Sequence, residues 1–522
     1  MATEIAFAFN DLAELARYQA SGRPEAVAIA FRGRETTYGQ LDNRAGQVAN
    51  GLRAISSVTE TRLALLARNS DVFYEVLFGA AKARDVLLAV NWRLAPAEIA
   101  WIINDAAAEV LFVGEEFFAV VAQILPELRT IKRIIALSSS GSEWEPYEVW
   151  RDRHACTDPH LEAVADDVVL QLYTSGTTGY PKGAQITHHN LFAALAGAKD
   201  WYPCTVADVS LACMPQFHIS GSLVGLIGLH VGARTLISEA APGEILRLIP
   251  TEQVALALFA PSLLLFLLQA PGCHDLHFSS LRRIVYAGSP MPLDVLRDAV
   301  ATFKCEFGQM YGLTETTGAV TLLSPNDHDP AGNRQMRSCG KPLNNAELKI
   351  VDGDGAELPC GTVGEIIVRS PQVMKGYWNL PEQTAITIRD GWLHTGDVGY
   401  VDEDGYVYVH DRLKDMIISG GENVYPAEVE SALFGHPAVA DVAVIGIPDA
   451  RWGEAVRAIV VVKPDAAVTE AELTAYCREM IAHYKTPKSI EFVESLPRNP
   501  SGKILKRVLR APYWDRHERQ VN

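Results

Sequence analysis

Short runs of apolar residues alternate along this chain with amphipathic segments of helical length. Residues 27–31 (VAIAF) form one such run, and the residues after it that fall on one helix face are Tyr38, Leu41, Ala45, Val48 and Leu52. Further strand-like runs are RLALLA (62–67), VLLAV (86–90) and EVLFVG (109–114). Strands separated by helices in this way predict a parallel α/β sheet with helices on both faces.

The length of the chain requires more than one core. Its 522 residues, 48% of them hydrophobic, exceed what a single core holds and supply enough apolar side chains for two domains. Near the C-terminus, a strand-like run at 455–462 precedes Thr469 and Glu472, which form a capping box. The residues that share a face of the following helix are Leu473, Tyr476, Met480 and Tyr484. We therefore expect a small second α/β unit at this end.

Composition excludes several classes of protein. A net charge of -17 argues against general nucleic-acid binding. The longest apolar stretch, 254–268, is interrupted by Pro261 and Ser262 and is too short for a transmembrane segment. The eight cysteines form no CxxC pair, so we expect reduced, buried thiols and no zinc site. The start, MATEIAFAFN, lacks the features of a secretory signal, and we expect a cytoplasmic protein.

The segment TSGTTGYPKG (174–183) follows the strand-like run VVLQLY and would lie at a strand's carboxyl end, where open α/β sheets bind ligands. Its glycines allow backbone N–H groups to turn inward, its hydroxyls add donors, and Lys182 adds positive charge. These are the properties of a phosphate-binding loop, although the pattern GxxxxGK[ST] is not met. Taken alone, such a composition is more typical of a flexible linker.

Four further stretches decide between these readings. They are QMYGLTE (309–315), HTGD (394–397), DRLKDMIISGGENVYP (411–426) and PRNPSGK (497–503). With the loop, they resemble the adenylate-forming (AMP-binding) superfamily of acyl-CoA synthetases, peptide-synthetase adenylation domains and beetle luciferases, over about residues 10–510. The resemblance implies an α/β fold with a large N-terminal domain of doubly wound sheets, residues 1–413, and a small mobile C-terminal α/β domain, residues 414–522.

The same resemblance implies residues for binding ATP and Mg²⁺. Those expected around the phosphates are Thr174, Ser175, Gly176, Thr177, Thr178, Gly179 and Lys182. Those expected around the adenosine are Gly288, Ser289, Gln309, Met310, Tyr311, Gly312 and Thr314, with the ring of Tyr311 stacked beside the adenine. Glu315 and Thr174 are expected at the metal, for which a carboxylate is a suitable hard oxygen ligand.

The segment from Asp397 to Arg412 reads as a hairpin. Asp404 and Gly405 are a strong signal for a two-residue turn, which would place Asp397 opposite Arg412. The resemblance assigns both residues to the ribose hydroxyls of the nucleotide, and the hairpin explains how they reach one sugar. A salt bridge across an exposed hairpin is the alternative.

Several roles follow from the resemblance alone. Lys414 matches the hinge of the mobile domain, and Gly420 and Gly421 match a loop that leaves a slot for the pantetheine of coenzyme A. Lys503 matches the lysine that reaches the reacting carboxylate, and His218 matches the gate between acid pocket and thiol tunnel. The expected catalytic residues are Lys503, His218, Glu315 and Thr174. Small expected pocket walls are Ile219, Ser220, Gly221, Ala287, Gly288, Gly312 and Ala319.

The implied activity is that of an ATP-dependent acyl-CoA ligase. A carboxylic acid, a fatty acid by the nearest resemblance, would attack the α-phosphorus of ATP, and coenzyme A would then take the acyl group from the adenylate. No aspartate lies between Met214 and Gly232 to pair with an amine, so an amino acid is not expected. The alternatives are an aryl or sterol-side-chain acid, an acyl-AMP ligase serving a carrier protein, a luciferase-like oxidation or an inactive binding protein. The oligomeric state stays open between a monomer and a homodimer.

Overall fold

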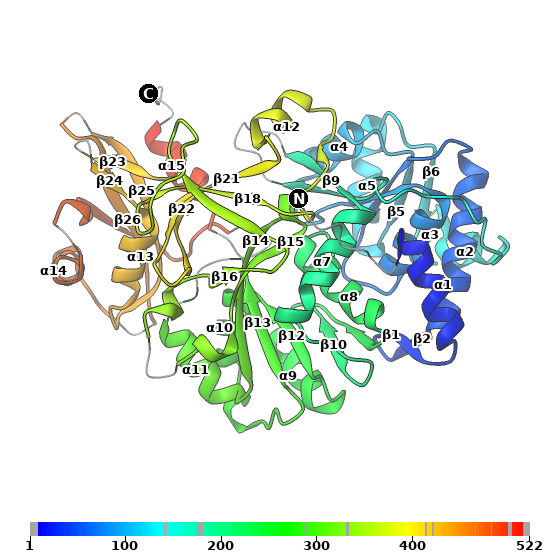
Figure 1. The fold of residues 1–522 in the computed structure, drawn as a ribbon, viewed down its shortest axis with the longest axis horizontal. Helices are drawn as coiled ribbons and strands as arrows, with labels where there is room; N and C mark the ends of the chain where they lie inside the picture. The colour runs from blue at the N-terminus through cyan, green and yellow to red at the C-terminus, as the bar shows by residue number, and fades with distance from the viewer. Residues whose placement is uncertain are drawn as a thin grey trace.

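The structure is a computed structural model. It describes residues 9–514 except 140, 142, 175–180, 289–290, 292, 330–332, 413–414, 420–421, 450, 465, 482 and 499–503. In this part of the chain, two large sheets form the N-terminal region, a five-stranded sheet follows them, and a second five-stranded sheet forms the C-terminal region. Figure 1 shows the latter at the left, in orange and red, beside the green and yellow strands of the preceding sheets.

The first large sheet has nine strands in the order β16-β15-β14-β13-β12-β10-β11-β1-β2. Strands β10, β12, β13 and β14 pair in parallel, so their carboxyl ends meet at one edge. The bounds are β1 (Val27–Phe31), β2 (Arg34–Thr37), β10 (Val209–Ala212), β11 (Arg234–Ile237), β12 (Leu256–Phe259), β13 (Arg283–Ala287), β14 (Glu306–Leu313), β15 (Gly318–Leu323) and β16 (Lys341–Pro342).

The second large sheet has eight strands in the order β19-β9-β8-β4-β3-β5-β6-β7. Its central strands are parallel, whereas β8 and β9 form an antiparallel pair. The bounds are β3 (Arg62–Leu66), β4 (Val86–Ala89), β5 (Val110–Val113), β6 (Arg133–Ala136), β7 (Glu145–Pro146), β8 (Val168–Thr174), β9 (Lys182–Thr187) and β19 (Gly376–Tyr377).

The two smaller sheets are mainly antiparallel. One contains β17 (Glu347–Val351), β18 (Gly364–Arg369), β20 (Ile388–Arg389), β21 (Trp392–Val401) and β22 (Val407–Arg412). The other contains β23 (Ile417–Ser419), β24 (Glu422–Val424), β25 (Val439–Asp449), β26 (Gly453–Val462) and β27 (Ser489–Phe492). The second sheet and the helices around it have a hydrophobic cluster of their own, which includes Ile417, Val444 and Leu473.

Helices pack on the large sheets and on the C-terminal sheet. Their bounds are α1 (Leu12–Gly22), α2 (Tyr38–Ile55), α3 (Val72–Ala83), α4 (Pro96–Asp105), α5 (Phe118–Ile124), α6 (Tyr147–Asp152), α7 (His188–Trp201), α8 (Ile219–Val231), α9 (Pro242–Thr251), α10 (Pro261–Gln269), α11 (Leu293–Phe303), α12 (Pro381–Thr387), α13 (Pro426–Phe434), α14 (Glu470–Met480) and α15 (Lys506–Trp514). Among the described residues, no helix is both long and apolar enough to span a membrane.

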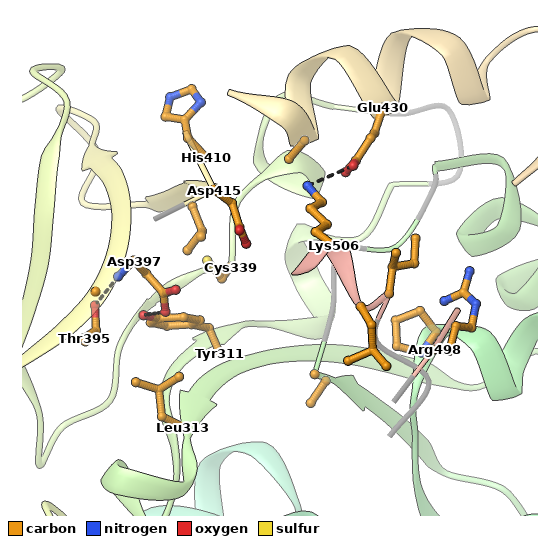
Figure 2. A pocket seen from close by; sticks show the side chains of 18 of the residues that line it. Tyr311, Leu313, Cys339, Thr395, Asp397, His410, Asp415, Glu430, Arg498 and Lys506 are labelled. Carbon is orange, nitrogen blue, oxygen red and sulfur yellow. Dashed lines mark hydrogen bonds and ion pairs between the residues drawn. The ribbon is translucent and has the colours of Figure 1, made fainter. Parts of the chain in front are cut away.

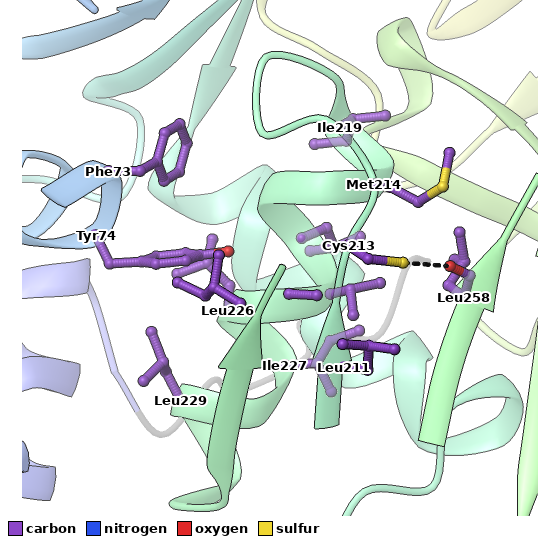
Figure 3. Close-up of a cluster of buried hydrophobic side chains, with 14 of the residues drawn as sticks. Phe73, Tyr74, Leu211, Cys213, Met214, Ile219, Leu226, Ile227, Leu229 and Leu258 are labelled. Carbon is purple, nitrogen blue, oxygen red and sulfur yellow. Dashed lines mark hydrogen bonds between the residues drawn. The ribbon is translucent and has the colours of Figure 1, made fainter. Parts of the chain in front are cut away.

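The main core lies between the two large sheets. Helix α3 packs on the eight-stranded sheet and α8 packs on the nine-stranded sheet, and the phenol of Tyr74 on α3 donates to the carbonyl oxygen of Ser222 on α8 at 3.1 Å. Figure 3 shows Phe73 and Tyr74 opposite Leu226 and Leu229, with Leu258 of β12 on the far side of the cluster. Helices α4 and α5 cover the other face of the eight-stranded sheet. The predicted doubly wound α/β architecture is confirmed.

Helix α14 differs from its sequence prediction. The capping box of Thr469 and Glu472 forms as expected, but α14 ends at Met480, before Tyr484. Leu473 is fully buried, as predicted for the inner face, together with Cys477, whereas the Met480 side chain is 60% exposed. The inner face is therefore set by the i, i+4 pair Leu473 and Cys477 rather than by the predicted four residues.

All eight cysteines are described, and none of them forms a disulfide, as expected for reduced thiols. Cys156 and Cys360 are exposed, however, and not buried as predicted.

The hairpin from Asp397 to Arg412 has the predicted pairing but a different turn. Asp397 lies opposite Arg412, whereas Tyr400 lies opposite Tyr408, so the register shifts by one residue between them at a bulge. The backbone N–H of Asp402 donates to the carbonyl oxygen of Tyr406 at 3.0 Å, which leaves a three-residue turn. The extra turn residue and the bulge compensate for each other, and Asp397 still faces Arg412.

Candidate active site

A large cleft lies between the N-terminal and C-terminal parts of the molecule, with a volume of about 3690 Å³. Its N-terminal wall includes residues at the carboxyl ends of parallel strands, such as Leu258, Ala287 and Met310. Its C-terminal wall includes Glu430 on α13 and Lys506 on α15. Ligands of open α/β sheets bind at such strand ends.

One end of the cleft holds Thr174 and Lys182. These residues end β8 and begin β9, where they form a cross-strand pair, and both line the cleft. The ammonium group of Lys182 donates to the side-chain oxygen of Gln383 at 3.0 Å and lies 5.1 Å from the centre of the Tyr377 ring. Lys182 is only 9% exposed, so its positive charge is held at a partly desolvated position in the wall of the cleft.

Glu315 lies next to this pair. Its Oε1 accepts a hydrogen bond from the phenol of Tyr377 at 2.8 Å and lies 3.4 Å from the donating hydroxyl of Thr174. The backbone is held as well, because the N–H of Met374 donates to the carbonyl oxygen of Glu315 at 2.8 Å. The structure thus brings together the two residues predicted at the metal.

This arrangement suits Mg²⁺ that shares its ligands with a substrate. In the described residues, no group of three or more histidine, cysteine, aspartate or glutamate side chains could hold a metal ion by itself. Glu315 and Thr174 supply one carboxylate and one hydroxyl oxygen. Mg²⁺ commonly takes one or two carboxylates and completes its shell with phosphate oxygens and water. The donor set therefore fits Mg²⁺ only together with a phosphate-bearing ligand.

A second polar group is formed by Tyr311 and Asp397. The phenol of Tyr311 donates to Oδ2 of Asp397 at 2.7 Å, and the two side chains face each other in Figure 2. The pairing of β14 with β15 shifts by one residue here, because Val320 of β15 is an extra residue between the partners of Tyr311 and Gly312. Gly312 is required there, because a Cβ atom would lie 1.9 Å from the carbonyl oxygen of Gly318. Arg412 lies opposite Asp397 in the pairing of β21 with β22. The structure describes its backbone and not its side chain.

The other described residues that were predicted to bind the nucleotide also line the cleft. They are Gly288, Gln309, Met310, Gly312 and Thr314. The side-chain oxygen of Gln309 accepts from the phenol of Tyr286 at 3.3 Å, which anchors it to the neighbouring strand. The Tyr286 side chain is fully buried, and the residues that line the cleft at this strand end are Ala287 and Gly288.

His218 stands at the start of α8, on the wall that bears apolar residues. Its ring lies 4.5 Å from that of Phe217, and its Nε2 atom is buried without a hydrogen-bond partner. Burial, together with the nearby positive charge of Arg93, lowers the pKa of His218 to about 4. The imidazole is therefore neutral near pH 7, and the residue lines the cleft. Gly221, by contrast, is no pocket wall, since it packs against the backbone of Met214 and Pro215.

Several predicted residues lie outside the described part of the chain. They are Ser175, Gly176, Thr177, Thr178, Gly179, Ser289, Lys414, Gly420, Gly421 and Lys503. The residues that follow Lys503 are described, and Ile504, Leu505 and Lys506 line the cleft. The ammonium group of Lys506 lies 2.8 Å from a carboxylate oxygen of Glu430, as Figure 2 shows.

Stacked rings cross the joint between the two parts. Tyr408 and Tyr400 stack with centroids 4.7 Å apart, and His410 lies 5.4 Å from Tyr400. His410 in turn stacks on Tyr425, just before α13, at 4.9 Å. The hairpin β21–β22 is thereby connected to the first helix of the C-terminal part.

Sequence reasoning missed Tyr377 and Gln383. Gln383 contacts Lys182, which lies 201 residues earlier in the chain. Tyr377 contacts Glu315, which lies 62 residues earlier. Gly376 and Tyr377 form a two-residue strand that pairs with β9. No local pattern links this segment to Lys182 or Glu315, and only the pairing of β19 with β9 brings it there.

Comparisons with known proteins agree with this geometry. Residues 16–378 match the family model described as AMP-binding enzyme, and residues 428–503 match the AMP-binding enzyme C-terminal domain. The chain is 41% identical to a fatty acid–[acyl-carrier-protein] ligase of Streptomyces coeruleorubidus, with 98% of each chain covered. It is 37% identical to a long-chain-fatty-acid–CoA ligase of Mycobacterium tuberculosis, over 91% of this chain and 93% of the other.

A solved structure has the same arrangement. An anthranilate CoA ligase in complex with anthranoyl-AMP superposes with a TM-score of 0.89 at 29% identity, over 98% of this chain and 99% of the other. Relatives with this fold thus act on acids of different chemistry, so the shared fold alone does not identify the acid.

Proposed function

Because the chain belongs to the AMP-binding enzyme family and is an adenylate-forming acid ligase, we propose that it activates a fatty acid with ATP and transfers the acyl group to coenzyme A. The observation that carries this proposal is the composition of the cleft. A polar end with Thr174, Lys182 and Glu315 lies in the same cavity as an apolar wall that begins at His218. A phosphate group and an apolar acid therefore have complementary places in one cavity.

The first step joins the acid to AMP. A carboxylate oxygen attacks the α-phosphorus of ATP, a P–O bond forms, and the bond to pyrophosphate breaks. Two anions meet in this step, so positioning and neutralisation of charge account for most of the acceleration. Lys182 would neutralise the phosphates, and Lys503 would neutralise the carboxylate and α-phosphate. Mg²⁺ held at Glu315 and Thr174 would supply further positive charge when bound.

The adenosine would bind along β14 and β21. The ring of Tyr311 offers an apolar face to the adenine, and Asp397 is positioned to accept hydrogen bonds from ribose hydroxyls. Its oxygens can accept from more than one donor, so the bond from Tyr311 leaves capacity for the sugar. Arg412, opposite Asp397, would complete this contact.

The second step transfers the acyl group to a thiol. The sulfur attacks the adenylate carbonyl, and AMP leaves with its phosphate oxygen. We propose that the C-terminal part turns about Lys414 for this step, which withdraws Lys503 and brings Gly420 and Gly421 to the tunnel. The neutral imidazole of His218 would line the passage between the acid and the thiol.

A carrier protein is the second candidate for the thiol. This alternative is favoured by the similarity, along almost the full length of both chains, to a relative named as a fatty acid–[acyl-carrier-protein] ligase. Both candidates share the acyl-adenylate and differ only in what bears the pantetheine.

The test is to identify products by mass spectrometry. The protein is incubated with Mg-ATP, coenzyme A and a panel of linear, aryl and polycyclic acids, with and without a phosphopantetheinylated carrier protein. Acyl-CoA and AMP from linear acids would support the proposal. Acyl-AMP that is consumed only by the carrier protein would replace coenzyme A as acceptor, and a preference for aryl or polycyclic acids would overturn the fatty-acid assignment.

A further inference from the structure

A chain of polar contacts connects Ser324, His328, Tyr286 and Gln309, and of these four described residues Gln309 alone lines the cleft. Nδ1 of His328 lies 2.8 Å from the carbonyl oxygen of Ser324, and Nε2 of the same ring lies 3.1 Å from the phenol oxygen of Tyr286. Tyr286 and Gln309 are cross-strand partners on β13 and β14, and the phenol oxygen lies 3.3 Å from the side-chain oxygen of Gln309. A residue of the cleft is thereby tied to two residues behind it.

The hydrogens in this chain are determined from its Ser324 end. A carbonyl oxygen only accepts, so Nδ1 of His328 carries a hydrogen. Burial lowers the pKa of His328 below its usual value, although the hydrogen bond to Ser324 and the carboxylate of Asp327 oppose this effect. The imidazole is therefore neutral above about pH 7, and its Nε2 has a lone pair and no hydrogen.

Tyr286 has a single hydrogen to donate. Its side chain is fully buried, and burial raises the pKa of the phenol, so the phenol stays protonated. Because Nε2 of His328 can only accept, the phenol donates its hydrogen there. The phenol oxygen then offers only lone pairs to Gln309, and an amide oxygen cannot bond to them. The two ends of an amide are nearly equal in shape, so exchanging the oxygen and the nitrogen of Gln309 removes this conflict.

We propose that His328, acting through Tyr286, holds the Gln309 amide with its nitrogen on the phenol and its carbonyl oxygen toward the cleft, which selects a 6-amino purine over a 6-oxo purine. This inference rests on the proposed function, in which Gln309 contacts the adenosine, and it makes His328 a positioning residue. Gln309 and Tyr311 lie two residues apart on β14 and both line the cleft, so a base beside the Tyr311 ring would have Gln309 at its edge. Adenine offers an amine there, whereas hypoxanthine offers an oxo group.

The experiment compares Mg-ATP with Mg-ITP, which differ at this position of the base. A carbonyl oxygen held toward the cleft accepts from the amine of ATP, but it meets the oxo group of ITP without a hydrogen between them. Such an unpaired contact should weaken binding by about tenfold or more. Isothermal titration calorimetry near pH 8, without any acid substrate, measures both dissociation constants, and the natural protein should bind ATP more tightly by at least this factor.

His328→Phe keeps a ring at this position and removes the acceptor. The phenol can then donate to the side-chain oxygen of Gln309, so the amide can turn either end to the cleft. We expect ITP to bind about tenfold more tightly than it binds the natural protein, with little change for ATP. Damage to the fold would not produce such a gain. His277→Phe is the matched control, because it makes the same change at an exposed histidine that does not line the cleft, and it should alter neither dissociation constant.

Two further measurements separate this role from a merely structural one. Tyr286→Phe should give the same gain for ITP, and His328→Phe should add nothing to it in the double variant, because His328 acts on Gln309 only through the phenol. NMR of the histidine ring nitrogens in the natural protein, with His328 assigned by its loss in His328→Phe, should show the hydrogen on Nδ1.

Three results would overturn the proposed role of His328. They are equal dissociation constants for ATP and ITP in the natural protein, an unchanged ratio of these constants in His328→Phe, and a hydrogen on Nε2 of His328. Failure of the proposed function is a different result, because the natural protein would then bind neither nucleotide, and both proposals would be wrong.

Discussion

The phenol of Tyr311 donates to Oδ2 of Asp397 at 2.7 Å and joins β14 to β21 across 86 residues of sequence. Asp397 is only 4% exposed, so this bond orients a carboxylate that has little access to water. The same bond fixes the ring of Tyr311. A nucleotide that uses both side chains would therefore meet them already positioned, and it would lose less conformational entropy on binding.

Tyr311→Phe tests this coupling. The variant keeps the aromatic face and removes the donor, so we expect roughly a tenfold higher KM for ATP, corresponding to about 1.5 kcal/mol for a hydrogen bond to a charged group. The KM for the acid should not change, which serves as the internal control. Steady-state kinetics with each substrate varied in turn measures both, and an unchanged KM for ATP would show that the bond does not contribute to nucleotide binding.

Tyr377→Phe tests the metal site. Without the phenol, Oε1 of Glu315 loses its 2.8 Å hydrogen bond and can rotate away from Thr174. Loss of such an orienting partner typically lowers metal affinity by at least about tenfold. We expect the Mg²⁺ concentration for half-maximal activity to rise by that factor. Tyr406→Phe is the matched control, since the Tyr406 phenol donates to Asp327 instead; an equal shift in both variants would argue against a role for Glu315.

Lys503→Ala tests whether Lys503 acts in the first step and not in the second. We expect formation of the adenylate to fall roughly a hundredfold or more, as for loss of one charge-stabilising group, whereas transfer from supplied acyl-AMP to coenzyme A continues. Rapid-quench measurements of each half-reaction separate the two. Equal losses in both would remove Lys503 from the role assigned to it.

His188→Asn tests a pH-dependent contact far from the cleft. Nδ1 of His188 accepts from the backbone N–H of Leu12 at 3.2 Å, and burial lowers the pKa of His188 to about 4. Between about pH 6.5 and 4, His188 binds a proton in the unfolded chain but not in the folded chain. The free energy of unfolding therefore has its full contribution from His188 above about pH 6.5 and loses it as the pH falls towards 4. Asparagine can accept the same bond without titrating.

We expect the natural protein to lose about 2 kcal/mol more than His188→Asn between pH 7 and pH 5. Denaturant unfolding of both proteins at pH 7 and pH 5 measures the two losses. Their difference isolates His188, because the other titrating groups are the same in both proteins. If both proteins lose the same amount, proton binding at His188 is not linked to folding.

Glu75→Gln tests a buried ion cluster. Glu75 is 1% exposed and accepts from Arg44 at 2.8 Å, Arg151 at 3.0 Å and the phenol of Tyr147 at 2.9 Å. Removing its charge takes a carboxylate from both guanidinium groups, of which Arg151 keeps its pair with Asp152 at 2.7 Å, and we expect a loss of about 3 kcal/mol in the free energy of unfolding. Glu148→Gln, at a side chain that is 71% exposed, should change it by less than about 1 kcal/mol. Similar effects of both would contradict the cluster's contribution.

The sequence was most informative where local patterns determine structure. The run at 27–31 forms β1, and the residues from Tyr38 to Leu52 lie on α2 as expected, because apolar periodicity directly reflects which face is buried. The hairpin shows the limit of such reasoning. Asp397 does face Arg412, but through a three-residue turn and a bulge, and neither could be read from Asp404 and Gly405.

Contacts between distant segments could not be predicted. The bond from Tyr377 to Glu315 depends on β19 joining the edge of the eight-stranded sheet, which no short pattern specifies. Likewise, the exposure of Met480 depends on what packs against α14 and not on the helix itself. Motifs identified which residues belong to the site, whereas the partners that orient them depend on tertiary packing.

The ring pair of His410 and Tyr425 spans the segment between the hairpin and α13. Any rotation of one part against the other about this segment separates the two rings. A stacked pair contributes about 0.5–1.5 kcal/mol, which corresponds to a population ratio of roughly two to ten. In the observed orientation, the pair therefore adds a modest stabilisation to the contact between the hairpin and the residue that precedes α13.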